Sequence, residues 1–152
     1  MDYRAFENQY YIRLDKGEEI ISALSSLCEK EGIKAASVQG IGGCEKATVG
    51  VFDMEDKTYL KEEIRAMLEL ISLTGNVTVY EDKPYLHLHA SFAYHDENGS
   101  AQTLSGHLLE AVIGLTGEIV LTASDIPIGR KYIEDLGIRI WDFDRKSDES
   151  RV

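Results

Sequence analysis

The chain has 152 residues, 43% of them hydrophobic and 28% charged, which is typical of one soluble globular domain. Its net charge of −11 and the lack of a dense basic run make it a poor candidate for tight, direct binding of nucleic acid, which needs lysine and arginine to displace counterions. Short apolar runs, an N-terminus unlike a signal peptide and only two cysteines, Cys28 and Cys44, predict a cytoplasmic protein with reduced thiols and no membrane span.

The first predicted elements are a strand and an amphipathic helix. Residues 10–14 are aromatic and β-branched, as in a short strand. Asp15 is placed to cap a helix, with Glu18 three residues later and Gly32 as its end. Apolar residues recur at helical spacing between them, at Ile20, Leu24, Leu27 and Cys28. We therefore expect a helix that covers one face of a sheet, with Cys28 as a core residue rather than a nucleophile.

Glycines and mixed patterns mark the middle of the chain. A strand from residue 35 runs into the glycine-rich segment 40–43, which lacks the spacing of a phosphate-binding loop and predicts a tight backbone corner. Residues 47–52 resemble a further strand, followed by a turn at 53–57. Residues 58–71 fit either a helical stripe or strands, and we favour strand, with a kink at Gly75–Asn76.

Three of the four histidines lie in one predicted hairpin. His87 and His89 are two residues apart in a strand, so they project to the same face. The polar segment 96–100 predicts a turn centred on residue 98, which places His107 opposite His89. A two-residue turn would instead send His107 to the other face, so the cluster requires an odd loop or a bulge. Three imidazoles on one face predict a site for zinc or another divalent transition metal.

The remaining chain predicts strands at 116–123 and 139–143, separated by a break at Pro127. Residues 1–143 are then a single α+β domain, a largely antiparallel sheet with one main amphipathic helix packed on it. Residues 144–152 form a polar segment that we expect to be mobile.

Several motifs resemble the plants-and-prokaryotes-conserved (PPC) domain family. They follow family order over residues 8–125 and comprise 39–43 with 48–50, 68–76, 87–91, 106–110 and 116–121. The resemblance implies an α/β domain that assembles as a homotrimer, and some prokaryotic members hold a metal at the positions of His87, His89 and His107. The chain is similar to the stand-alone prokaryotic members, which usually carry a provisional DNA-binding label. It lacks the AT-hook of plant members and departs from their partner-recruiting motif at 66–71.

Three functions follow as hypotheses. The first is a homotrimeric module that binds a metal or a small-molecule ligand. The second is a DNA-associated regulator, which the charge of −11 argues against, so that any DNA association would be weak or indirect. The third is a zinc enzyme acting on a small carbonyl or acid substrate, suggested by long-range similarity to acetolactate decarboxylases, and the sequence favours a non-enzyme over it. Glu110, three residues after His107, is a candidate for a base or for a partner of a metal ligand.

Overall fold

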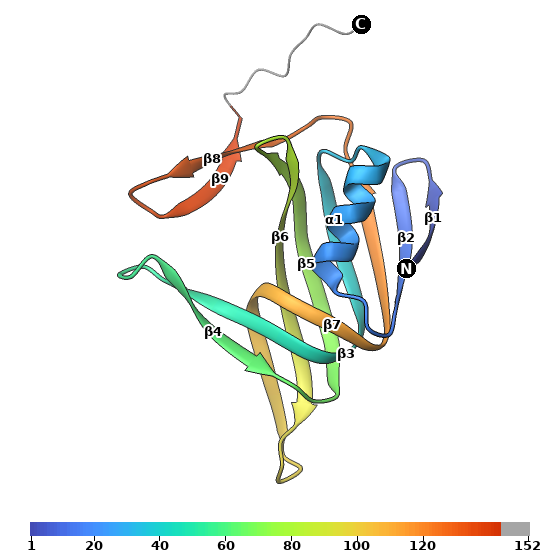
Figure 1. The fold of residues 1–152 in the computed structure, drawn as a ribbon, viewed down its shortest axis with the longest axis vertical. Coiled ribbons are helices and arrows are strands. Elements are labelled where there is room, and N and C mark those ends of the chain that lie inside the picture. The colour runs from blue at the N-terminus through green and yellow to red at the C-terminus, as the bar shows by residue number, and fades with distance from the viewer. Residues whose placement is uncertain (144–152) are drawn as a thin grey trace, which may run out of the picture.

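The structure is a computed structural model that describes residues 1–143, so the tail predicted at 144–152 lies outside the described residues. One helix and nine strands make up this part of the chain (Figure 1). In chain order they are β1 (Asp2–Phe6), β2 (Gln9–Asp15), α1 (Ile20–Glu31), β3 (Ala36–Asp53), β4 (Thr58–Ile64), β5 (Leu68–Tyr80), β6 (Lys83–His95), β7 (Ala101–Ala123), β8 (Gly129–Ile133) and β9 (Ile138–Asp142). The α+β class with a mostly antiparallel sheet is therefore confirmed.

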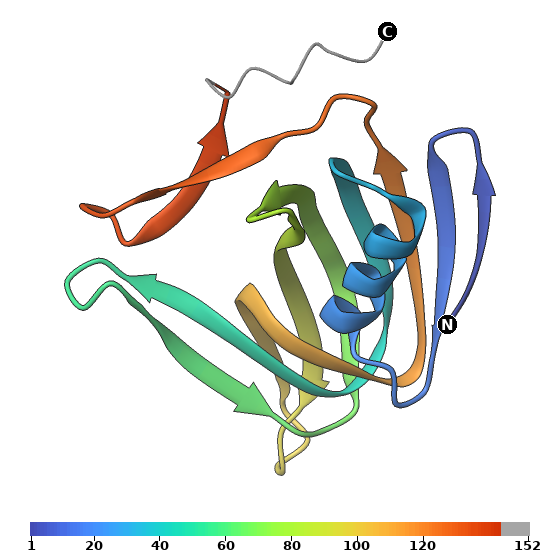
Figure 2. The same ribbon diagram turned by 45° about the horizontal axis from the view of Figure 1, so that its top comes forward.

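Two long strands, β3 and β7, organise the sheet. The strand order is β1-β2-β7-β3-β5-β8-β9, with β4 paired to β3, and β6 paired to both β5 and β7. The first half of β3 pairs with β5 and with the end of β7, whereas its second half pairs with β4 and with the start of β7. The sheet consequently curls, and Figure 2 shows β4 turning away from the strands that α1 covers.

Helix α1 packs on this curled sheet through the predicted apolar stripe. Its buried side chains are Ile20, Leu24, Leu27 and Cys28, and burial raises the pKa of the Cys28 thiol to about 12, which leaves it unreactive. Gly32 ends the helix in the left-handed conformation, as predicted. The predicted start was wrong: the cap is Glu19, whose carboxylate accepts hydrogen bonds from the amides of residues 21 and 22.

The predicted glycine corner is a bend within one strand. β3 runs without a break through residues 40–43, and its pairing shifts register between Gly40 and Gly42 and again between Gly42 and Cys44. A β-carbon on Gly42 would lie 2.4 Å from the carbonyl oxygen of Thr116, so only glycine allows β3 and β7 to approach this closely. Most of the ambiguous residues 58–71 form strand, as favoured, in β4 and the start of β5 with a break at residues 65–67, while β1 and β8 were not predicted.

Among residues 1–143, no helix combines the length and the apolar character that crossing a membrane would require.

Candidate metal centre

The three histidines meet on one face of the β6–β7 hairpin. His89 is the cross-strand partner of His107, and the pairing continues in register to His95 and Ala101. The loop between the strands therefore spans residues 96–100, the odd length that the cluster requires. Asp96 holds this loop, because its carboxylate accepts hydrogen bonds from the amides of residues 98 and 100, each at 2.9 Å. The predicted register is confirmed.

The spacing of the imidazoles suits a small cation. One nitrogen from each of His87, His89 and His107 lies within 4.8 Å of the others. The Nε2 atoms of His87 and His89 are 3.3 Å apart. Two nitrogens bound to one tetrahedral zinc at their usual bond length of about 2.05 Å would be separated by about 3.3 Å. His87 and His89 thus stand at ligand spacing, and a nitrogen of His107 lies within 4.8 Å of theirs.

An aromatic side chain holds His107 in place. The ring of Tyr59 on β4 stacks on His107 with 4.7 Å between centroids and 21° between planes. Gly50, the cross-strand partner of His107 on β3, makes room for this stack, because a β-carbon there would lie 2.9 Å from the Tyr59 side chain. Sequence reasoning missed Tyr59, since only the pairing of β4 with β3 brings it to the site.

The environment favours neutral imidazoles. Burial, then the positive charge of Arg130 and of His89, lowers the pKa of His87. Burial, together with His87, His89 and Arg130, lowers the pKa of His107 to about 4. Neutral imidazole is the form that binds a metal, so near pH 7 these two rings need not lose a proton first.

One ring nitrogen provides an independent test of the fit. The Nδ1 atom of His107 is buried and has no hydrogen-bond partner among residues 1–143. A buried polar atom without a partner costs about 1–3 kcal/mol. A bond from this Nδ1 atom to a metal would offset that cost, and three neutral imidazoles are a donor set that zinc accepts. The residues present therefore fit a divalent transition metal.

An arginine that sequence reasoning missed lies beside the histidines. Arg130 on β8 is only 7% exposed, and its guanidinium donates to side chains of β5 and stacks on Tyr85 of β6. Twenty-three positions separate it from His107, in a segment for which no strand was predicted. No sequence signal links the two, because the pairing of β8 with β5 brings them together.

Glu110 has a lysine for a partner. Its carboxylate accepts a hydrogen bond from the ammonium group of Lys46 at 2.6 Å, and the same lysine lies 3.4 Å from the carboxylate of Glu63. The expected role of Glu110 as a base or as a partner of a metal ligand stays a prediction.

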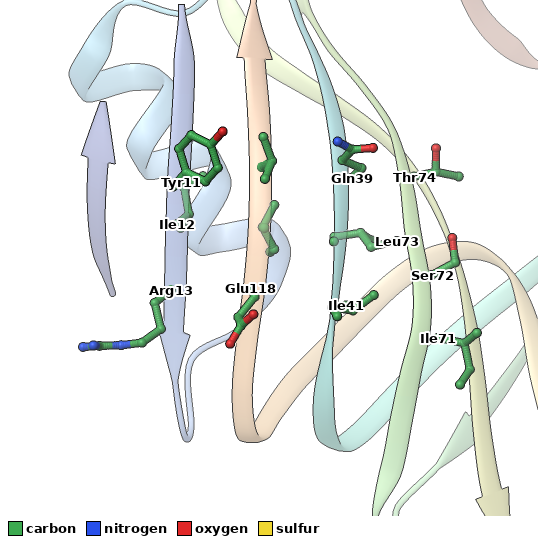
Figure 3. A pocket seen from close by; sticks show the side chains of 13 residues that line it. Tyr11, Ile12, Arg13, Gln39, Ile41, Ile71, Ser72, Leu73, Thr74 and Glu118 are labelled. Carbon is green, nitrogen blue, oxygen red and sulfur yellow. The ribbon is translucent and has the colours of Figure 1, made fainter. Parts of the chain in front are cut away.

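A groove lies on the open face of the sheet, across β2, β7, β3 and β5. Its volume is about 710 Å³, and Figure 3 shows Tyr11, Gln39, Ile41, Ile71 and Thr74 along it. Large apolar side chains at the groove and beside it are exposed: Tyr11 (55%), Ile41 (56%), Ile71 (57%) and Leu115 (62%). Thr74 is the cross-strand partner of both Gln39 and His89, so the groove and the histidine cluster are neighbours on the sheet.

Known proteins match most of the chain. A family model described as the Plants and Prokaryotes Conserved (PCC) domain matches residues 1–125. A candidate DNA-binding protein from Bacteroides thetaiotaomicron is 35% identical, with a TM-score of 0.86 over 95% of this chain and 98% of its own. A metal-containing protein from Archaeoglobus fulgidus is 30% identical, with a TM-score of 0.78 over 92% of this chain and 96% of its own. A plant- and prokaryote-conserved (PPC) protein from Pyrococcus horikoshii is 30% identical, with a TM-score of 0.78 over 93% and 94%.

More distant comparisons bear on the fold alone. The acetolactate decarboxylase of Bacillus subtilis is 13% identical, with a TM-score of 0.52 over 83% of this chain and 57% of its own. No curated protein sequence matches the chain.

Proposed function

Because the chain belongs to the Plants and Prokaryotes Conserved (PCC) domain family, we propose that it is a metal-binding, homotrimeric member of that family. His87, His89 and His107 hold one divalent transition metal, with zinc as the first choice. The observation that carries this proposal is the meeting of three imidazoles with one nitrogen of each within 4.8 Å of the others, one ring having a buried nitrogen with no partner among the described residues. A relative at 30% identity is described as metal-containing, which supports it. Metal analysis of the untagged protein and of a His107 variant tests it, with the expected results given in the Discussion.

Three protein ligands leave a fourth position on zinc open, as in catalytic zinc sites rather than closed structural ones. When bound, such a metal supplies a Lewis acid that polarises a carbonyl group or acidifies a bound water. Residues of the chain position the histidine side chains. Tyr59 fixes the His107 ring by stacking, and the hairpin register aligns His89 with His107. An enzyme acting on a small carbonyl or acid substrate is the alternative function for the same site.

We assign the trimer contact to the exposed groove. The large apolar side chains of the groove, Tyr11, Ile41 and Ile71, and Leu115 beside it would each remove apolar area from water in an assembly, worth roughly 25 cal/mol per Å². Light scattering coupled to size-exclusion chromatography should give three times the chain mass of 17.0 kDa. Ile71→Asp should shift the protein to smaller species, because a carboxylate in an apolar contact loses its hydration without a partner.

Leu60→Asp is the matched control for this experiment, since Leu60 on β4 is 62% exposed but does not line the groove. It should leave the mass unchanged. A wild-type protein that elutes as a monomer at micromolar concentration would contradict the trimer.

Relatives described as candidate DNA-binding proteins suggest a second function, and we infer that any direct contact with DNA is weak. The net charge of −11 opposes the approach of a polyanion, and nucleic-acid affinity depends on basic residues that release counterions. Fluorescence anisotropy with a duplex of about 30 base pairs should detect no binding below about 10 µM protein at physiological salt. Tighter binding that weakens steeply with added salt would show that direct contact is real.

A further inference from the structure

The guanidinium of Arg130 is buried and is held by hydrogen bonds to neighbouring residues. The guanidinium donates from Nε to Thr78 Oγ1 at 2.7 Å, from Nη1 to the carbonyl oxygen of Arg139 at 2.9 Å and from Nη2 to Asn76 Oδ1 at 2.9 Å. The Cζ atom of Arg130 lies 4.5 Å from the centroid of the Tyr85 ring. Every acceptor is neutral, and together they fix the plane and the position of the fork.

Within residues 1–143, no carboxylate lies at ion-pair distance from this guanidinium. The ion pairs among the described residues involve other cations, and burial lowers the pKa of Arg130, opposed only by the nearby Tyr85. A buried charge without a counter-charge is costly, and proteins usually pair it. Arginine carries five N–H groups, of which the scaffold uses three. One N–H on each terminal nitrogen is left to bind something else.

The guanidinium stands next to the histidine cluster. Tyr85, on which it stacks, precedes His87 by two residues on β6, so the two side chains share a face with His89. Asn76, which accepts from Nη2, is the cross-strand partner of His87 on β5. The charge of Arg130 is close enough to lower the pKa of both His87 and His107. The guanidinium and the three imidazoles therefore lie near one another on the same face of the sheet.

We propose that Arg130 binds a small oxyanion, a carboxylate or a phosphate, at the histidine cluster. This inference rests on the proposed metal site, since a bound divalent cation would also attract the anion. The planar fork of arginine matches two oxygens of a carboxylate or phosphate, and such charge-assisted bonds are about twice as strong as neutral ones. The rest of this acidic chain repels anions, so affinity for one depends on this local charge. Arg130 lies beyond residues 1–125, so the family match does not carry this site.

The test is the affinity of the metal-loaded chain for acetate and for inorganic phosphate. Calorimetric titration at fixed ionic strength gives the affinity, and the visible spectrum of the cobalt-loaded protein reports whether the anion reaches the metal. Arg130→Gln should weaken binding by about 10-fold or more, because hydrogen bonds to a charged group are worth about 1.5–3 kcal/mol. The metal content per chain should stay the same. The anion that binds more tightly to the wild-type protein identifies the ligand class.

Two further variants keep the result interpretable. Arg130→Lys retains the buried charge but lacks the planar fork, so it should also weaken binding even if Arg130→Gln fails to fold. Arg4→Gln removes an exposed arginine on β1, away from the histidines and the groove, and should leave anion binding unchanged. Metal-loaded Arg130 variants that bind both anions as tightly as the wild-type protein would overturn the inference and leave the metal proposal standing. A wild-type chain that takes up no metal, but whose anion binding weakens in the Arg130 variants, would instead contradict the metal proposal and support the anion site.

Discussion

His107→Ala should reduce the zinc bound by the purified, untagged protein from about one ion per chain to nearly none. Zinc with three protein ligands loses one of them in this variant. Loss of a residue that only supports a ligand typically costs 10- to 100-fold in metal affinity, so loss of a ligand should cost more than about 100-fold. The variant also removes the buried Nδ1 atom without a partner, so the metal-free chain should lose little stability beyond the stacking with Tyr59.

Thermal melting separates these effects. Zinc at about 1,000 times its dissociation constant should stabilise the wild-type protein by about 4 kcal/mol, and the same zinc should leave His107→Ala almost unchanged. His95→Ala is the control, because His95 is exposed at the end of β6 and pairs with Ala101 near the loop. It should bind and respond like the wild-type protein. Full zinc occupancy in His107→Ala would remove the histidine cluster as the metal site.

The histidine cluster was predictable because strand geometry has few options. Side chains alternate strictly along a strand, so His87 and His89 had to share a face. Only the length of the loop remained open, and the five residues from Asp96 to Ser100 brought His107 to the same face. The helix stripe was equally predictable, since the spacing of its apolar residues allows one buried face.

What surrounds the histidines was not predictable, because it depends on pairing between distant segments. Tyr59 reaches His107 only after β4 folds back on β3, and Arg130 reaches Asn76 only after β8 joins the edge of β5. Neither pairing leaves a local pattern in the sequence. The bend of β3 was misread as a corner for a similar reason, since a register shift depends on both partner strands.

The start of the helix was predicted at the wrong residue because two acidic residues, Asp15 and Glu19, can each act as its cap. Glu18 accepts a hydrogen bond from the amide of Asp15, the contact that a capping box at Asp15 would make. The helix nevertheless begins later, where Glu19 satisfies two free amides with one carboxylate. Local spacing predicts that such contacts form, but it does not decide whether Asp15 or Glu19 caps the helix.

Gly75→Ala should be among the most damaging single substitutions in the chain. Gly75 lies in β5 between β3 and β6, and a β-carbon on it would be 2.0 Å from the carbonyl oxygen of His87. Backbone cannot swing aside as a side chain does, so β5 and β6 would have to separate. We expect a loss of about 3 kcal/mol in the free energy of unfolding, at the upper end of overpacking effects. Urea unfolding with a metal chelator present measures this loss without interference from bound metal.

Gly43→Ala on β3 is the matched control for Gly75→Ala. Its β-carbon would meet the ends of the Met67 and Leu115 side chains, at 2.9 and 3.2 Å, and both side chains are largely exposed and can move. It should cost less than about 1 kcal/mol. Similar losses in the two variants would show that the close approach of Gly75 to β6 is not what requires glycine. A larger loss at Gly75, with weaker zinc binding by the folded fraction, would mean that this glycine positions His87 as well as stabilising the sheet. The close approach of β5 and β6 at Gly75 would then also position His87 and His89 relative to His107.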